Sequence, residues 1–247
     1  MRGLMSRERM WHLEGASNFR DLGGYRTIDG RETRWGRIFR SDTLCAITAQ
    51  DLSTLRSLAI KSVIDLRSPG EIAYTGRGLV ATSTISLLEV GAMEDESPTS
   101  GRMNHTSLDD AYWDYLTLGS AKFVRALQEL GRGETYPVVL SCFFGKDRTG
   151  VLAALVLACV GVHTDVIVDD YVLTGTRMPE LLRRLKDDRV YRETLEQTPE
   201  WKLAASPLTM AAFLARIEND FGGAESWALQ AGVGEDQLRN LRETFLT

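Results

Sequence analysis

The chain has 247 residues, of which 43% are hydrophobic and 26% are charged, and its formal net charge is -5. This length and composition allow one α/β domain with a sizeable core and exclude a chain that is disordered throughout. The acidic balance argues against a general polyanion-binding protein, so we expect no nucleic-acid partner.

Cysteine usage and hydropathy indicate the compartment. The three cysteines, Cys45, Cys142 and Cys159, are too few and too unevenly placed for a disulfide framework or a zinc site. The basic N-terminus lacks the apolar core of a signal peptide, and the longest apolar run, residues 151–160, is too short to span a bilayer. We therefore expect a cytoplasmic protein without a membrane span, in which a reactive thiol would survive.

Strand and helix patterns alternate along most of the chain. The strand candidates are short apolar runs bounded by turn residues, at 37–40, 61–66, 84–90 and 138–142. The helix candidates have apolar faces or long apolar stretches, at 49–58, from the cap Ser107 to Gly131, at 149–160, and as two or three small helices within 209–246. Loops or turns are expected at 15–30, 67–70 and 91–107. This alternation predicts a single α/β domain over residues 1–247, with a mostly parallel sheet flanked by helices.

Residues 176–205 differ from this pattern because they combine many charges with scattered apolar positions. Two interpretations are open. The segment is either a solvated surface helix or a helical lid over a reactive loop, bounded by Gly175 and Pro179 on one side and by Pro207 on the other.

The strongest chemical signal lies in residues 138–161. A β-branched apolar run ends at Cys142, Arg148 follows six positions later, and Thr149 and Gly150 open a wholly apolar helix. A thiol at a strand end, a loop of backbone amides and a helix N-terminus together make an anion site with a nucleophile at its base. This combination is suited to attack on a phosphate ester.

The expected roles follow from charge. The helix N-terminus, the loop amides and Arg148 all stabilise an anion, so we expect Cys142 to be a thiolate that attacks phosphorus in line. Arg148 would hold two phosphate oxygens in a bidentate fork, and the loop amides would complete a cradle for the developing charge. Thr149 would donate to the sulfur and help it leave. The residues expected to contact the substrate are Phe143, Phe144, Gly145, Lys146, Thr149 and Gly150.

Two acids are candidates for proton transfer. Asp147 lies inside the anion site, so it either pairs with Lys146 or Arg148, or is held protonated to serve the leaving group, and we favour the second. Asp65, at the end of a predicted strand, is the competing general acid, and Arg67 is placed to orient neighbouring acids. Lys146 is either a solvated lysine or a contact for a substrate phosphate.

The loop CFFGKDRTG resembles the signature of bacterial tyrosine phosphatases that carry a Cys-x-x-Gly-Lys-Asp-Arg-Thr-Gly loop, an atypical group known for dual protein and phosphoinositide specificity. Other segments resemble motifs of the same family in the same order: NFRDLGGY at 18–25, IFRSD at 38–42, VIDLRSPGE at 63–71, DDYVLT at 169–174, FGGAESW at 221–227 and GVGEDQLRNLR at 232–242. The resemblance therefore spans most of the chain.

This resemblance implies the tyrosine-phosphatase α/β fold with a helical lid, catalysis without a metal or other cofactor, and a thiophosphoryl-cysteine intermediate. It implies that Cys142 is the nucleophile and Arg148 the phosphate clamp. It also implies that Asp147 is the acid and that Lys146 takes part in substrate selection. Arg20 and Asp21 match the N-terminal motif, and their implied role is to brace the loop.

One residue departs from the family pattern. The family has His immediately before the nucleophile, where it hydrogen-bonds loop backbone, and this chain has Ser141. Serine is shorter and never cationic, so the arrangement around Cys142 is expected to differ. Phe143 and Phe144 also make the loop unusually apolar, which is compatible with a small metabolite as substrate.

Three functions are therefore open. The one we favour is a cysteine-dependent phosphomonoesterase that acts on phosphotyrosine, with phosphoserine or phospholipid headgroups as further substrates. The second keeps the chemistry but acts on a soluble metabolite, such as a sugar or nucleoside phosphate. The third is a non-catalytic phosphate-binding module, for which Ser141 is the only support. The sequence does not indicate an oligomeric state.

Overall fold

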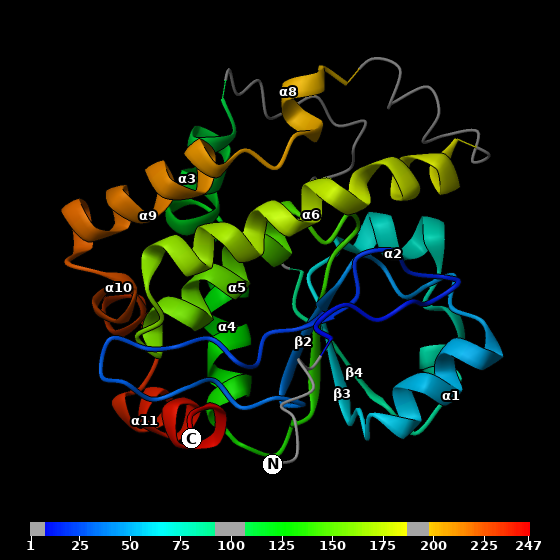
Figure 1. Cartoon of the computed structure of the whole chain (residues 1–247), viewed down its shortest axis with the longest axis horizontal. Coiled ribbons are helices and arrows are strands. Elements are labelled where there is room, and N and C mark those ends of the chain that lie inside the picture. The colour runs from blue at the N-terminus through cyan, green and yellow to red at the C-terminus, as the bar shows by residue number, and fades with distance from the viewer. Residues whose placement is uncertain (1–7, 92–106, 187–197) are drawn as a thin grey trace, which may run out of the picture.

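The computed structural model describes residues 8–91, 107–186 and 198–247, and within them a five-stranded sheet forms the centre of the fold (Figure 1). The strand order is β1-β2-β5-β3-β4. The strands are β1 (Arg20–Asp21), β2 (Ile38–Ser41), β3 (Ser62–Asp65), β4 (Ser86–Glu89) and β5 (Val138–Ser141). β1 is antiparallel to β2, and the other neighbouring pairs are parallel. The predicted mostly parallel sheet is confirmed.

β5 is the central strand and sets the position of the reactive loop. It pairs with β2 on one side and β3 on the other, so that Ser141 lies opposite both Ser41 and Asp65. All four of its residues are buried, as expected for an apolar strand covered on both faces. Because the three strands are parallel, the loops that follow their carboxyl ends lie at one edge of the sheet.

Helices cover both faces of the sheet (Figure 1). On one face, α1 (Ala49–Ser57) and the 3-10 helix η1 (Gly78–Thr82) share a core with alternate residues of β2, β3 and β5. On the other face, the main core joins the sheet to α4 (Ser120–Gly131) and α5 (Asp147–Cys159). The remaining helices are α2 (Pro69–Thr75), α3 (Leu108–Thr117), α6 (Thr164–Leu185), α8 (Glu200–Leu203), α9 (Pro207–Phe221), α10 (Ala224–Gln230) and α11 (Glu235–Phe245).

α5 is a core helix whose first turn follows directly on the reactive loop. Residues 148–157 are all buried, because an almost wholly apolar helix is stable only when it is covered on every side. Gly161, just beyond the C-cap, has a φ of 84°, which lets the chain reverse there as the sequence predicts. The N-terminus of α5 is thereby fixed at the end of β5.

Two local predictions are wrong. The turn expected at 67–70 is instead the start of α2, because Ser68 caps the helix and forms a reciprocal capping box with Glu71. The segment from Ser107 to Gly131 is not one helix but two, α3 and α4, which are separated at Leu118 and Gly119.

The segment 176–205 does not begin as a separate helix. α6 continues through Gly175 and Pro179 to Leu185, and α8 follows later in the chain. The middle of the expected lid, residues 187–197, lies outside the described residues, as do residues 1–7 of the basic N-terminus and residues 92–106 of the predicted polar loop. None of the helices within the described ranges has the length and apolar character needed to cross a membrane.

Candidate active site

The loop from Cys142 to Lys146 joins the central strand to the N-terminus of α5. Cys142 is only 2% exposed, so it lies enclosed at the base of this loop. Lys146 is the N-cap residue of α5, and its side chain does not cap the helix. An N-terminus of this kind presents backbone N–H groups and the positive end of the helix dipole to an anion. The structure thus places the thiol and the helix N-terminus at the same loop, as the sequence predicts.

Gly145 has a conformation that only glycine can adopt at this position. Its φ is 65°, and a Cβ atom built on it would lie 2.5 Å from the Asp42 amide nitrogen and the Ser41 carbonyl oxygen. Its own carbonyl oxygen accepts hydrogen bonds from Asn18 Nδ2 at 3.1 Å and from Arg40 Nη2 at 2.8 Å. These bonds fix the direction of the Gly145 peptide, and with it the conformation of the loop.

The two arginines behind Gly145 share one buried carboxylate. Arg20 and Arg40 lie 3.0 and 2.7 Å from the two oxygens of Asp170 on α6. Burial lowers the pKa of Arg20 to about 10, and the neighbouring Arg40 lowers it further while Asp170 opposes the shift. Burial would raise the pKa of Asp170, but the two guanidinium groups outweigh it and hold that pKa far below its usual range. The cluster therefore braces the loop and leaves an excess of positive charge behind it.

Arg148 is held by a carboxylate that sequence reasoning did not single out. Its Nη1 and Nη2 atoms lie 2.5 and 2.7 Å from the two oxygens of Glu71 on α2, and Nη1 also donates to the Leu66 carbonyl at 3.1 Å. Both side chains are buried. The signal for Glu71 is present in the sequence as the Ser-x-x-Glu capping box that begins at Ser68.

Asp147 is the most exposed of the charged residues in the loop. Its side chain is 23% exposed, and Oδ1 accepts a hydrogen bond from Tyr112 at 2.7 Å and lies 3.0 Å from Lys146 Nζ. Tyr112 in turn lies 2.7 Å from the hydroxyl of Tyr171. The pairing of Asp147 with Lys146 is therefore present in the structure, and the favoured role of Asp147 as the acid for the leaving group stays a prediction.

The ammonium of Lys146 is directed at the backbone of the C-terminal end of α8. The side chain is 1% exposed, and Nζ donates to the carbonyl oxygens of Lys202 at 2.6 Å and Ala204 at 3.2 Å. These contacts join the reactive loop to the described part of the segment 176–205. A substrate phosphate would have to compete with them for the Lys146 ammonium.

Ser141 immediately precedes Cys142 and bonds to the neighbouring strand end. Its hydroxyl donates to the Asp42 carbonyl at 3.0 Å, and the Thr43 amide donates to the Phe143 carbonyl at 3.0 Å. The Phe143 ring is buried and packs edge-on against Phe144, with ring centroids 5.0 Å apart. The segment that follows β2 therefore lies directly against the loop that follows β5.

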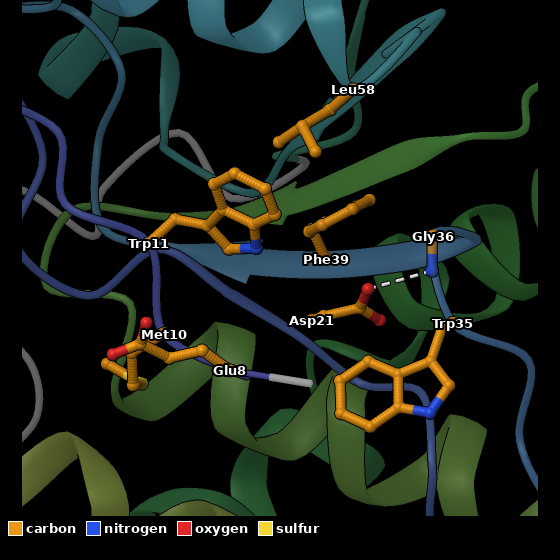
Figure 2. Close-up of a pocket in the computed structure, with 8 residues that line it drawn as sticks. All are labelled: Glu8, Met10, Trp11, Asp21, Trp35, Gly36, Phe39 and Leu58. Atoms are coloured by element: carbon orange, nitrogen blue, oxygen red, sulfur yellow. Dashed lines mark hydrogen bonds between the residues drawn. The ribbon is translucent and has the colours of Figure 1, made fainter. Parts of the chain in front are cut away.

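Two acids named from the sequence are engaged elsewhere. Both oxygens of Asp65 accept hydrogen bonds from Arg67, the shortest of them at 2.6 Å. Asp21 accepts from the amides of Gly23 and Gly36 at 2.7 Å, and Figure 2 shows the second of these bonds at the edge of a pocket of about 380 Å³. No residue of the loop 142–150 lines this pocket. Asp21 thus ties β1 to the Gly36 turn.

Comparison with known proteins settles the family. A family model described as the tyrosine phosphatase family matches residues 11–247. The chain belongs to this family. The protein is therefore a phosphatase, an enzyme that hydrolyses phosphoric monoesters and acts on phosphorylated substrates, and the predicted family and enzyme class are confirmed.

Two relatives by sequence agree with this assignment. The chain is 30% identical to the triple specificity protein phosphatase PtpB of Mycobacterium tuberculosis, over 95% of this chain and 98% of that protein. It is 32% identical to a putative tyrosine-protein phosphatase of Cupriavidus necator, over 65% of this chain and 61% of that protein. Among solved structures, the catalytic core of the phosphatase Siw14 of S. cerevisiae aligns with a TM-score of 0.42 and 18% identity, covering 77% of this chain and 97% of that one.

Most of the predicted loop residues lie together, and the missed ones surround them. Residues 142–146 join β5 to α5, residues 147–150 form the first turn of α5, and Arg20 reaches the loop through Asn18, which bonds to Gly145. The supporting residues that the sequence reasoning did not name as part of the site are Asn18, Arg40, Glu71, Tyr112 and Asp170. In residues 8–91, 107–186 and 198–247, no group of three or more His, Cys, Asp or Glu side chains is arranged to hold a metal ion.

Proposed function

We propose that Cys142 is the nucleophile of a tyrosine or dual-specificity phosphatase and that the loop 142–148 is its phosphate site. The position of the thiol carries this proposal: Cys142 follows the central strand directly, and five residues later α5 begins with an N-terminus that no side chain caps. Such a site stabilises both the thiolate and the phosphate that it attacks. Arg148, in the first turn of α5, adds a fixed guanidinium.

In the first step, Sγ of Cys142 forms a bond to phosphorus while the ester P–O bond breaks. Asp147 gives a proton to the departing oxygen. In the second step, water attacks the phosphoryl group, Asp147 takes a proton from that water, and the S–P bond breaks to release phosphate and the thiolate. Asp147 suits this role better than Asp65, because its carboxyl is partly exposed in the loop whereas both oxygens of Asp65 are bound by Arg67.

Arg148 and Thr149 support the sulfur and the phosphate. Glu71 binds the Arg148 guanidinium through Nη1 and Nη2, which sets its plane. A guanidinium fixed in this plane is suited to bind two phosphate oxygens. Thr149 is fully buried, and its hydroxyl has no hydrogen-bond partner among the described residues, so a thiolate leaving group would give it one.

Steady turnover of an aryl phosphate tests this proposal. We expect the wild-type protein to hydrolyse 4-nitrophenyl phosphate and Cys142→Ser to lose at least about 10³-fold in kcat, because a serine hydroxyl is hardly ionised in a site tuned for a thiolate. Vanadate should inhibit competitively and EDTA should have no effect. Near-wild-type turnover by Cys142→Ser would contradict the assignment, and absence of turnover by the wild type would favour the phosphate-binding module.

The substrate within the class of phosphate esters is a further part of the proposal. Phosphotyrosine is the substrate that family membership supports, and the relative PtpB is a triple specificity protein phosphatase. Phe143 and Phe144 make the loop apolar, and for this reason a small metabolite is the second candidate substrate. A panel of phosphopeptides and small phosphate esters separates them, because a kcat/KM far higher for one metabolite would decide for the second. Cytoplasmic location and a lid at 176–205 stay predictions.

A further inference from the structure

One face of α6 lies against the residues that hold the reactive loop. The residues on this face are spaced four or three positions apart, so they form one stripe along the helix: Asp170, Thr174, Arg177, Leu181 and Arg184. Near its start, Asp170 binds Arg40 and Thr174 accepts from Asn18. Both Arg40 and Asn18 donate to the Gly145 carbonyl of the loop.

The other end of the stripe reaches the same region from the opposite direction. Arg184 lies 3.0 Å from Asp42 and donates to the Ser17 hydroxyl at 2.9 Å. Asp42 also accepts from the Ser17 and Asn18 amides, and its carbonyl oxygen accepts from Ser141. Thr174 and Arg184, which lie on either side of Arg177 along the stripe, therefore both bind segments packed around the loop. Arg177 lies between them, three residues or ~4.5 Å along the helix from Thr174.

Arg177 differs from the other arginines around the loop because it has no hydrogen-bond or ion-pair partner among the described residues. It is half-buried, its Nε atom is enclosed, and within the described residues it makes no hydrogen bond and no ion pair. By contrast, Arg20, Arg40 and Arg184 each bind a carboxylate. An enclosed N–H group without an acceptor is costly, and a ligand that supplied an acceptor would remove this cost.

Charge around the loop also favours an anion. The cationic side chains that lie in or against the loop and its supports are Arg20, Arg40, Lys146, Arg148, Arg177 and Arg184. They are matched, among the described residues, by the carboxylates of Glu71, Asp42, Asp147 and Asp170. Burial also raises the pKa of Asp42, which reduces its capacity to neutralise a neighbouring cation. Among the described residues, the region therefore carries more cationic than anionic side chains, in a chain whose formal net charge is -5.

We infer that Arg177 forms a second anion subsite beside the catalytic loop and selects substrates that carry a carboxylate or a second phosphate in addition to the phosphate that is cleaved. This inference rests on the proposed function of the loop. A guanidinium is suited to the role because its planar donors bind two oxygens of either group. Thr174, about one helical turn before Arg177, shares Asn18 with Gly145 of the loop, so the substrates of the test vary the spacing between the two anions.

The test compares substrates on the same enzyme. Values of kcat/KM are measured for phenyl phosphate, its 2-, 3- and 4-carboxylated derivatives, 1,3-phenylene bisphosphate and a longer carboxybiphenyl phosphate. The ratio of each value to that of phenyl phosphate is then compared between the wild type, Arg177→Gln and Arg177→Lys. A misfolded fraction changes both values equally, so it cancels in the ratio. Arg183, exposed on the same helix and without partners among the described residues, provides the control Arg183→Gln.

We expect the wild type to prefer at least one substrate with a second anion, and Arg177→Gln to lower that ratio by about 10-fold, the effect of one lost charge-assisted contact. Arg177→Lys should lie between the two, and Arg183→Gln should keep the wild-type ratios. Equal ratios in the wild type and Arg177→Gln for every substrate would overturn the inference. If Cys142→Ser is inactive in that case, the proposed function stands and only the subsite fails.

Discussion

Arg148 and Glu71 form a buried two-point ion pair, with both Nη atoms of the arginine within 2.7 Å of the carboxylate oxygens. The pair joins the first turn of α5 to the first turn of α2. Because Glu71 is also the capping-box partner of Ser68, one side chain both starts α2 and orients the arginine of the reactive loop. The first turn of α2 therefore helps to set the geometry of the loop between β5 and α5.

Replacement of Glu71 tests the importance of this pair. Glu71→Gln keeps a capping-box side chain but leaves Arg148 without its carboxylate, so we expect the free energy of unfolding to fall by about 3 kcal/mol. The kcat/KM for 4-nitrophenyl phosphate should fall as well, because the guanidinium loses its fixed plane. Urea unfolding and steady-state kinetics measure the two effects. Glu89→Gln, which removes a more exposed pair with Arg77, is the control and should cost less than about 1 kcal/mol. Equal effects of the two substitutions would contradict the account.

Gly145→Ala tests whether the loop depends on one backbone conformation. A methyl group at this position meets the backbone of Ser41 and Asp42 at 2.5 Å, so we expect a loss of at least about 2 kcal/mol in unfolding free energy and a large loss of kcat. Gly133→Ala is the matched control, since Gly133 also has a positive φ but its nearest neighbouring atom is 4.0 Å away. That variant should lose about 1 kcal/mol and keep its activity. Normal activity of Gly145→Ala would show that the loop tolerates a different path.

Asp147→Asn tests the assignment of the acid. Without a proton donor, hydrolysis of esters with poor leaving groups should slow by about 10²-fold or more, whereas 4-nitrophenyl phosphate should slow less. Asp65→Asn should change both classes of ester equally, because Asp65 holds Arg67. Rates measured over a series of aryl and alkyl phosphates decide the question. A leaving-group dependence that appears only in Asp65→Asn would transfer the role to that residue.

The dependence of stability on pH follows from Asp170 and Glu71. The guanidinium partners overcome burial and hold the pKa of both carboxyl groups below the usual range, so each binds protons more weakly in the folded than in the unfolded chain. Their contribution to stability is complete above the unfolded values near ~4 and is lost as the pH falls toward the folded values.

We expect the free energy of unfolding to fall less between about pH 5 and pH 3 in Asp170→Asn than in the wild type. Asp170→Asn should nevertheless be less stable at pH 7. Urea unfolding at each pH measures it. Asp169→Asn is the control, because Asp169 is exposed beside Asp170 on α6. Parallel pH curves for the wild type and Asp170→Asn would contradict the assigned role of the cluster.

The sequence predicted the central part of the site because its signals are local. The β-branched run before Cys142 and the apolar helix after Thr149 stand next to each other in the chain, so their order alone places the loop between strand and helix. The family resemblance, which spans most of the chain, is confirmed by the family match.

The parts that could not be predicted depend on contacts between distant residues. Arg40 and Asp170 lie 130 positions apart, and nothing in the local pattern of either residue indicates that they meet behind Gly145. The α2 helix was missed because Pro69 and Gly70 are typical of turns, and the capping box that overrides them was not recognised. The position of the Lys146 ammonium depends on carbonyl groups more than 50 residues away.

The central claim is that the Cys142 sulfur becomes bonded to phosphorus during turnover. The most direct measurement is mass spectrometry of wild-type protein that has been mixed with 4-nitrophenyl phosphate, quenched in acid within one turnover and digested. We expect one added phosphoryl group on the peptide that contains Cys142, and none in Cys142→Ser. A phosphoryl group on another residue, or turnover by Cys142→Ser at the wild-type rate, would contradict it.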